Sequence, residues 1–246
     1  MERRSFLKIT GASAAAVVIA PSLITQRLYA DDGLSLYESY EKVHLKDENG
    51  NPLKASTLQP EVNYVFNFPH IATPCILVDL GRPANKDVKL TADDGTEYLF
   101  KGGVGKNGSI VAYSAICPHQ LTHPTPDDSF FQYLERKGKT LALPDAKEAG
   151  IFVCSSHLSA FDPVNGGKAI AGPATEGLTQ IVLEIDENDE LWAVGALGPN
   201  RFHDYMDAFK PEFKKYYENK RKAKRLVKDE AKVVALKHFT KEIIQY

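Results

Sequence analysis

The sequence predicts an all-β domain, a small antiparallel barrel or sandwich between about residues 60 and 200. Short runs rich in β-branched and aromatic residues recur there, and clusters of Gly, Pro, Asn and Asp separate them. The composition is that of a folded protein, with 43% hydrophobic and 25% charged residues in 246. We find no internal repeat that would indicate a solenoid or a propeller.

The individual strands follow from hydrophobic patterning. Residues 62–68 alternate apolar and polar side chains, the period-two pattern of a half-buried strand. The other predicted strands are short apolar runs at residues 75–80, 109–116, 151–154, 180–185 and 190–194. Residues 34–60 are more polar and carry a turn signal at 49–52.

The first 30 residues have the pattern of an export signal. Arg3 and Arg4 precede a mildly apolar run from about residue 9 to 25, which is typical of a twin-arginine (Tat) signal. The alternative is a membrane helix, but the run is at the lower end of the ~17–25 residues that span a bilayer, and Pro21 interrupts it. We therefore expect a periplasmic protein, either released after Ala30 or tethered to the membrane by an uncleaved signal.

Residues 201–246 differ in composition from the predicted β domain at 31–200. They contain 13 Lys+Arg against 7 Asp+Glu, no Gly and one Pro, which predicts a basic helical extension. Its basic face is either simply solvated or a docking arm for a partner. Nucleic acid is not an expected partner, because the whole chain has a net charge of -2 and carries an export signal.

Two clusters of cysteine and histidine predict a metal centre. Cys117 and His119 follow one predicted strand, and Cys154 and His157 follow another. Two thiolates and two imidazoles suit a tetrahedral Zn²⁺ or a [2Fe–2S] cluster with two Cys on one iron and two His on the other. Three cysteines in the whole chain exclude a disulfide scaffold but supply the two that either site needs.

The residues after His157 favour the iron–sulfur cluster. Ser159, Phe161 and the Gly–Pro–Ala run around Pro173 stand where the Rieske family has the pattern C-x-x-H-x-S-x-[YF]-D and a Gly–Pro–Ala loop, so this chain resembles that family. The resemblance implies one [2Fe–2S] cluster per chain, held by the predicted loops near residues 117–123 and 154–163. It implies that Ser159 donates a hydrogen bond to the cluster and that Pro173 belongs to a loop that shields the cluster. With Phe161 at its position, a second hydrogen-bond donor to the cluster is missing.

A closer resemblance, over roughly residues 35–205, is to the small Rieske subunit of arsenite oxidase. It rests on residues 68–69, 73–75, 102–107, 110–114, 172–176 and 193–195. The implied fold is a cluster-binding β subdomain inserted in a larger antiparallel barrel. The implied function is a periplasmic electron-transfer subunit, not catalytic alone. It would relay single electrons between a large molybdenum-pterin subunit and a cytochrome c or blue-copper carrier.

The chain departs from this resemblance at three places. Family members commonly carry one more cysteine in each loop, and these pair as a disulfide. Thr122 (or a neighbour) and Ser156 stand at those positions here, and only Cys75 remains besides the two predicted ligands. The segment 121–150 is longer than usual, and the basic tail is extra. With no disulfide and no second hydroxyl donor, we expect a midpoint potential in the low to middle part of the Rieske range of ~−150 to +300 mV.

Three alternative functions would each require other features in the sequence. The Rieske subunit of a cytochrome bc-type quinol-oxidising complex would need a membrane anchor, for which the N-terminal run is weak. An oxygenase component needs a further iron site with two His and a carboxylate, and only His203 and His238 follow the second loop. A structural Zn module would leave the flanking residues unexplained. His123 is a less favoured alternative ligand for the metal centre. Cys75 is expected to be a buried, small apolar residue.

Overall fold

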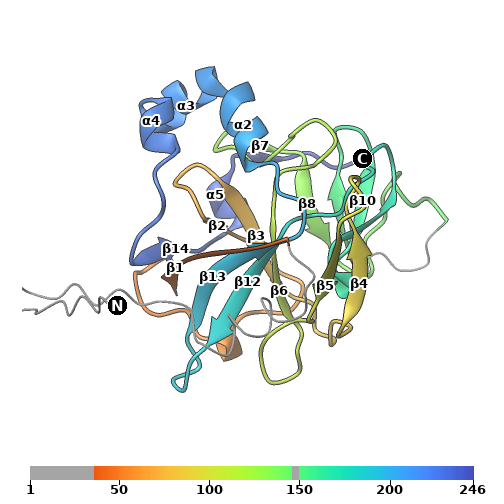
Figure 1. The fold of residues 1–246 in the computed structure, drawn as a ribbon, viewed down its shortest axis with the longest axis horizontal. Coiled ribbons are helices and arrows are strands. Elements are labelled where there is room, and N and C mark those ends of the chain that lie inside the picture. The colour runs from red at the N-terminus through yellow and green to blue at the C-terminus, as the bar shows by residue number, and fades with distance from the viewer. Residues whose placement is uncertain (1–35, 146–149) are drawn as a thin grey trace, which may run out of the picture.

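The fold is mainly β with a few short helices, as the sequence predicts, and it is shown in a computed structural model in Figure 1. The structure describes residues 36–145 and 150–246. The predicted signal at 1–30 lies outside the described residues. Within those ranges no helix is long and apolar enough to cross a membrane.

In the described ranges the main sheet has eight strands, in the order β14-β1-β13-β12-β6-β3-β2-β15. They are β1 (Tyr37–Lys46), β2 (Tyr64–Asn67), β3 (Pro74–Asp79), β6 (Ile110–Ser114), β12 (Gln180–Ile185), β13 (Leu191–Leu197), β14 (Glu230–Lys232) and β15 (Val234–Ala235). The two edge strands are consecutive in sequence: β14 pairs in parallel with β1, and β15 pairs antiparallel with β2. One stretch near the C-terminus therefore joins both edges and nearly closes the sheet into a barrel.

Strand β3 is buried on both faces, and its side chains divide between two cores. Cys75 and Leu77 belong to a hydrophobic cluster that also contains Phe213 of the C-terminal extension. Ile76 and Val78 point to the opposite face, as alternate residues of a strand must, and join a second cluster. The sheet thus has the barrel interior on one side and packs an inserted subdomain on the other.

The inserted subdomain lies between β6 and β12, which are neighbours in the main sheet. Its sheet has the order β11-β10-β9-β8 in the described residues. These strands are β8 (Phe131–Leu134), β9 (Ile151–Cys154), β10 (Ser159–Asp162) and β11 (Lys168–Ala171), with a 3-10 turn at Pro163–Asn165. Two small ribbons accompany it, β4 (Val88–Thr91) with β5 (Glu97–Phe100), and β7 (Asp128–Ser129) with β16 (Glu242–Ile243). This is the barrel with an inserted subdomain that the resemblance implies.

The C-terminal extension is mainly helical in its first half and has one short helix in its second half. Helices α2 (Phe202–Ala208), α3 (Lys210–Tyr217) and α4 (Lys220–Ala223) form an arc at one end of the β structure, and α5 (Leu236–Phe239) follows β15 (Figure 1). Strands β14, β15 and β16 were not predicted, because each is very short and finds its partner far away in sequence. Tyr205 and Phe213 are almost fully buried in the barrel core, so the apolar side of the extension packs on the barrel, while most of its basic side chains are exposed.

Candidate metal centre

The two predicted ligand loops lie at the ends of different strands. The first follows β6 and carries Cys117 and His119. The second is the turn between β9 and β10, in which Cys154 pairs with Ser159 across the ladder, and it carries His157. A strand end fixes where each loop starts, so residues 37 positions apart in sequence come to one site.

The two loops have matching backbone conformations. Leu121 and Leu158, each four residues after its cysteine, both have φ 60°. A left-handed conformation is costly for a branched side chain, about 1–3 kcal/mol, and such strain clusters at functional sites. The shared Cys-x-x-x-Leu spacing is a signal from which this similarity between the loops could have been found.

Both cysteine sulfurs are buried and face each other. Cys117 and Cys154 are each 1% exposed, and their side chains are hydrogen-bonded to one another. Each sulfur also faces two backbone N–H groups of its own loop, those of His119 and Gln120 in the first and of Ser156 and His157 in the second. The contact with Cys154 and these N–H groups lower the pKa of Cys117, although burial opposes this, and the same contact together with burial raises the pKa of Cys154. A pair of thiolates would thus find hydrogen-bond donors already in place.

The two histidine rings form a second pair. The ring centroids of His119 and His157 are 4.9 Å apart at an angle of 83°. His157 is exposed, while His119 is half-buried and its Nδ1 is a buried nitrogen with no hydrogen-bond partner in the described residues. A buried nitrogen with no hydrogen-bond partner, two residues from a buried thiol, is suited to bind a metal.

The donors are arranged as two pairs and not around one point. Among the described residues, no three His, Cys, Asp or Glu side chains converge on a position for a single ion. Tetrahedral Zn²⁺ would need four donors around one centre. A sulfur pair beside an imidazole pair fits a [2Fe–2S] cluster, which places two ligands on each iron.

Ser159 connects the two loops with the loop that covers them. Its hydroxyl is buried, donates to the Cys117 sulfur and accepts from the backbone N–H of Ala174 at 3.3 Å. Gly172 has φ 81°, and a Cβ there would lie 2.4 Å from the Leu158 carbonyl oxygen. The Gly–Pro–Ala run therefore lies directly on the second ligand loop, with Pro173 on its exposed side.

Two further side chains near the site differ in polarity. Phe161 is fully buried, packs near Phe131 with centroids 6.2 Å apart, and contributes no donor. Ser155, which we did not single out from the sequence, is 2% exposed, and its hydroxyl has no partner in the described residues. It directly follows the ligand candidate Cys154, and a serine within the C-x-x-H motif is the signal that could have identified it.

The remaining sequence candidates have other partners. Both ring nitrogens of His123 are hydrogen-bonded, to the Leu121 carbonyl oxygen and to Glu212, so it has no free nitrogen for a metal. Cys75 is fully buried, and burial raises the pKa of its thiol, which donates to the Phe68 carbonyl oxygen at 3.0 Å. His238 pairs with Glu48 at 2.7 Å.

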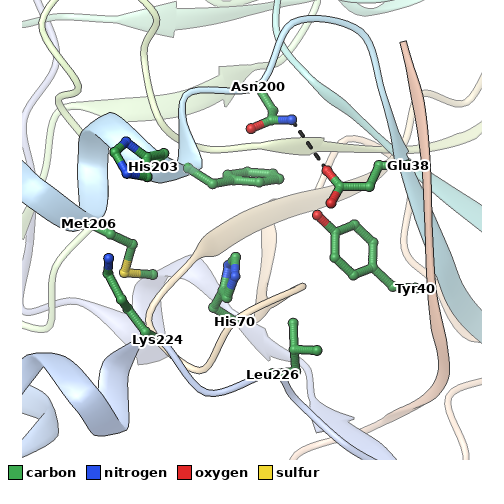
Figure 2. Close-up of a pocket in the computed structure, with 9 residues that line it drawn as sticks. Glu38, Tyr40, His70, Asn200, His203, Met206, Lys224 and Leu226 are labelled. Carbon is green, nitrogen blue, oxygen red and sulfur yellow. Dashed lines mark hydrogen bonds between the residues drawn. The ribbon is translucent and has the colours of Figure 1, made fainter. Parts of the chain in front are cut away.

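A surface pocket of about 470 Å³ lies away from these ligands, between β1 and the C-terminal extension. Figure 2 shows Glu38 and Tyr40 on one side of it, and His203 and Lys224 on the other. None of the four predicted ligands lines it. The pocket marks the junction between barrel and extension and is not part of the metal centre.

Comparison with known proteins agrees with this geometry. Residues 81–182, which include both ligand loops, match the model of the Rieske [2Fe-2S] domain. Two similar curated proteins are each described as "Iodate reductase subunit IdrB". The protein from Pseudomonas sp. (strain SCT) is 29% identical over 215 residues, covering 86% of this chain and 87% of the relative. The protein from Denitromonas iodatirespirans is 28% identical over 202 residues, covering 80% and 82%.

Among solved structures, the soluble domain of the Rieske protein II from Sulfolobus acidocaldarius matches with a TM-score of 0.44 and 24% identity, over 69% of this chain and 85% of that chain.

The match to the family model contains every residue of the two ligand loops. The paired thiols and paired imidazoles of this site are the donor set that a Rieske cluster requires. The chain therefore contains a Rieske [2Fe–2S] domain, and the cluster that it binds is of the Rieske type.

Proposed function

We propose that this chain relays single electrons between a molybdenum-pterin catalytic subunit and a small redox carrier in the periplasm. Its Rieske domain makes it an electron-transfer subunit. The relatives that it matches over most of their length are named as subunits of iodate reductase. The motifs shared with the small subunit of arsenite oxidase point to the same class of catalytic partner.

One observation carries this proposal most directly: the site is exposed at an imidazole and buried at its sulfurs. His157 is exposed and lies against His119, whereas both cysteines and Ser159 are buried. When bound, the cluster supplies one-electron chemistry. The exposed imidazole edge is where a carrier such as a cytochrome c or a blue-copper protein would approach, and the buried sulfurs are protected from water and oxidants.

The direction of electron flow distinguishes two catalytic partners. A reductase partner would draw electrons from the carrier through this subunit, while an arsenite oxidase-like partner would deliver them. We expect the full-length chain to copurify with a large molybdenum-containing subunit from a host that expresses both. In that complex, iodate is expected to oxidise the reduced cluster within seconds, and arsenite to leave the oxidised cluster unchanged.

Absorbance of the cluster, followed after mixing with each compound, measures this. The isolated chain, without its large subunit, is the control and is expected to respond to neither compound. Reduction by arsenite would reverse the proposed direction. Copurification with a cytochrome b and reduction by quinol would replace the proposal by the bc-type alternative.

The periplasmic location rests on the twin-arginine pair and is tested separately. Replacing Arg3 and Arg4 together by Lys keeps the charge but removes the guanidinium pair, and it is expected to leave the protein in the cytoplasmic fraction. The matched control is Lys8→Arg, which makes the same exchange in reverse outside the pair. Equal periplasmic amounts of both variants would show that export does not depend on this motif.

A further inference from the structure

The C-terminal extension contacts the first ligand loop through one buried histidine. His123 is 5% exposed, and its Nδ1 lies 2.7 Å from the carbonyl oxygen of Leu121. Its Nε2 lies 2.7 Å from a carboxylate oxygen of Glu212 in α3. Both partners present an oxygen to the ring, so the imidazole links α3 directly to the loop backbone.

The link reaches the backbone of a ligand in two further steps. The N–H of Leu121 donates to the carbonyl of Cys117 at 2.9 Å, and the N–H of Cys117 donates to the carbonyl of Thr122 at 2.8 Å. Leu121 is also the residue held in the left-handed conformation. A displacement of the Leu121 carbonyl would therefore be passed to the Cys117 backbone.

The helices that hold His123 are themselves fixed to the barrel. The rings of Tyr205 and Phe209 lie edge-on to the imidazole, with centroids at 4.6 and 4.7 Å. The Tyr205 hydroxyl donates to the carbonyl of Ala72 at 2.8 Å, and Phe213 is fully buried in the barrel core. The surface that contacts the His123 ring is thus built by the extension, which is itself packed on the barrel.

A second group of contacts holds the chain just after His123. Asp127 accepts from Lys215 at 2.5 Å, from the Tyr216 hydroxyl at 2.6 Å and from Lys241 at 2.6 Å. These three donors lower the pKa of Asp127, so its carboxylate stays charged. Strand β16 of the tail also pairs in parallel with β7, which begins at Asp128.

The two ligand loops differ in how much support they receive from their own subdomain. The second loop is a turn between paired strands β9 and β10, and the Gly–Pro–Ala run packs on it. The first loop lies between β6 and β7, which are not paired with each other. No disulfide joins the loops, because Cys75, Cys117 and Cys154 are all free thiols.

We propose that His123 and Glu212 are a positioning pair through which the C-terminal extension holds the first ligand loop in place for the cluster. The extension then belongs to the cluster site, and it supplies from outside the subdomain the support that the first loop lacks within it. The proposal concerns this chain alone and does not depend on which catalytic subunit it serves.

The test is Glu212→Gln in the full-length protein with its cluster, compared with Glu218→Gln. The first variant keeps the shape but removes the charge that faces His123. The second makes the same change at an exposed residue that follows the other end of the same helix, where the partner is Lys222. Three properties are measured: the rate of iron release to a chelator, the g values of the reduced cluster, and its midpoint potential.

We expect Glu212→Gln to release iron about tenfold faster, the change that follows when a charge-assisted hydrogen bond is lost. We also expect its g values and midpoint potential to move away from those of the wild type, and Glu218→Gln to match the wild type in all three. A merely structural contact would lower the unfolding temperature without moving g values or potential in the folded fraction. That result, or wild-type behaviour, would overturn the proposal.

His123→Gln provides a second variant in case Glu212→Gln does not fold. It removes the imidazole that joins the Leu121 carbonyl oxygen to Glu212. The same three properties should change in the same sense, and an unchanged cluster would refute the proposal. Failure of the copurification experiment with a catalytic subunit would leave all these readouts intact, so the two proposals can fail separately.

Discussion

Cys117→Ser is expected to abolish cluster binding, and Cys154→Ser to do the same. A hydroxyl is a far weaker ligand for iron than a thiolate, and each cysteine supplies half of the sulfur pair at the site. Iron and acid-labile sulfide should fall from two of each per chain to background. The visible absorbance and the rhombic EPR signal of the reduced protein should disappear.

Cys75→Ser is the matched control for these variants. Cys75 is as deeply buried as the two ligand candidates, and its thiol donates to the Phe68 carbonyl oxygen, a role that a hydroxyl can take over. This variant should retain two irons per chain and the full EPR signal. Two irons in Cys117→Ser would remove that residue from the ligand set, and loss of iron in Cys75→Ser would show that the assay reports folding.

The same preparations distinguish an iron–sulfur cluster from a structural zinc site. Metal analysis of the wild type should give two irons and no zinc. One zinc per chain with no EPR signal would refute the electron-transfer function, because Zn²⁺ has no redox chemistry. The paired arrangement of donors makes the first outcome the expected one.

The parts of the fold that the sequence predicted well are those governed by local pattern. Strands β9 and β12 have the predicted bounds, because each is a short, mostly buried apolar run between turn residues. Strand β1 was missed because its first half is largely exposed, and only Val43 and Leu45 are buried near its end. A strand whose side chains face solvent carries little hydrophobic signal.

The same distinction holds at the metal centre. The spacing within each loop predicted Cys117, His119, Cys154 and His157, because a ligand pair on one loop is a local pattern. The contact between His123 and Glu212 joins residues 89 positions apart, and no local pattern indicates it. The sequence alone left His123 as an alternative ligand, since a histidine four residues after His119 has the right chemistry for a metal.

The structure also relates two departures from the family pattern that had no common explanation. The long segment between the loops and the C-terminal tail contact each other. Strand β7 pairs with β16, Asp127 binds Lys215 and Lys241, and the Thr140 hydroxyl donates to the backbone carbonyl of Tyr246 at 3.0 Å. The longer segment between the two ligand loops is therefore covered by the C-terminal tail.

Ser159→Ala is expected to lower the midpoint potential while leaving the cluster bound. The Ser159 hydroxyl donates to the Cys117 sulfur, and such a bond is stronger when the cluster carries the extra electron. The whole bond to a charged group is worth about 1.5–3 kcal/mol. The difference between the two redox states is smaller, so we expect a decrease of roughly 30–100 mV for a one-electron couple.

Ser129→Ala is the matched control for this shift. Ser129 is also fully buried near the subdomain, and its hydroxyl donates to the Phe131 carbonyl oxygen at 2.7 Å. Its removal should cost stability without changing the potential. Redox titration followed by EPR measures both variants under the same conditions. A potential in Ser159→Ala equal to that of the wild type would mean that the hydroxyl holds Ala174 of the covering loop and does not stabilise the reduced cluster.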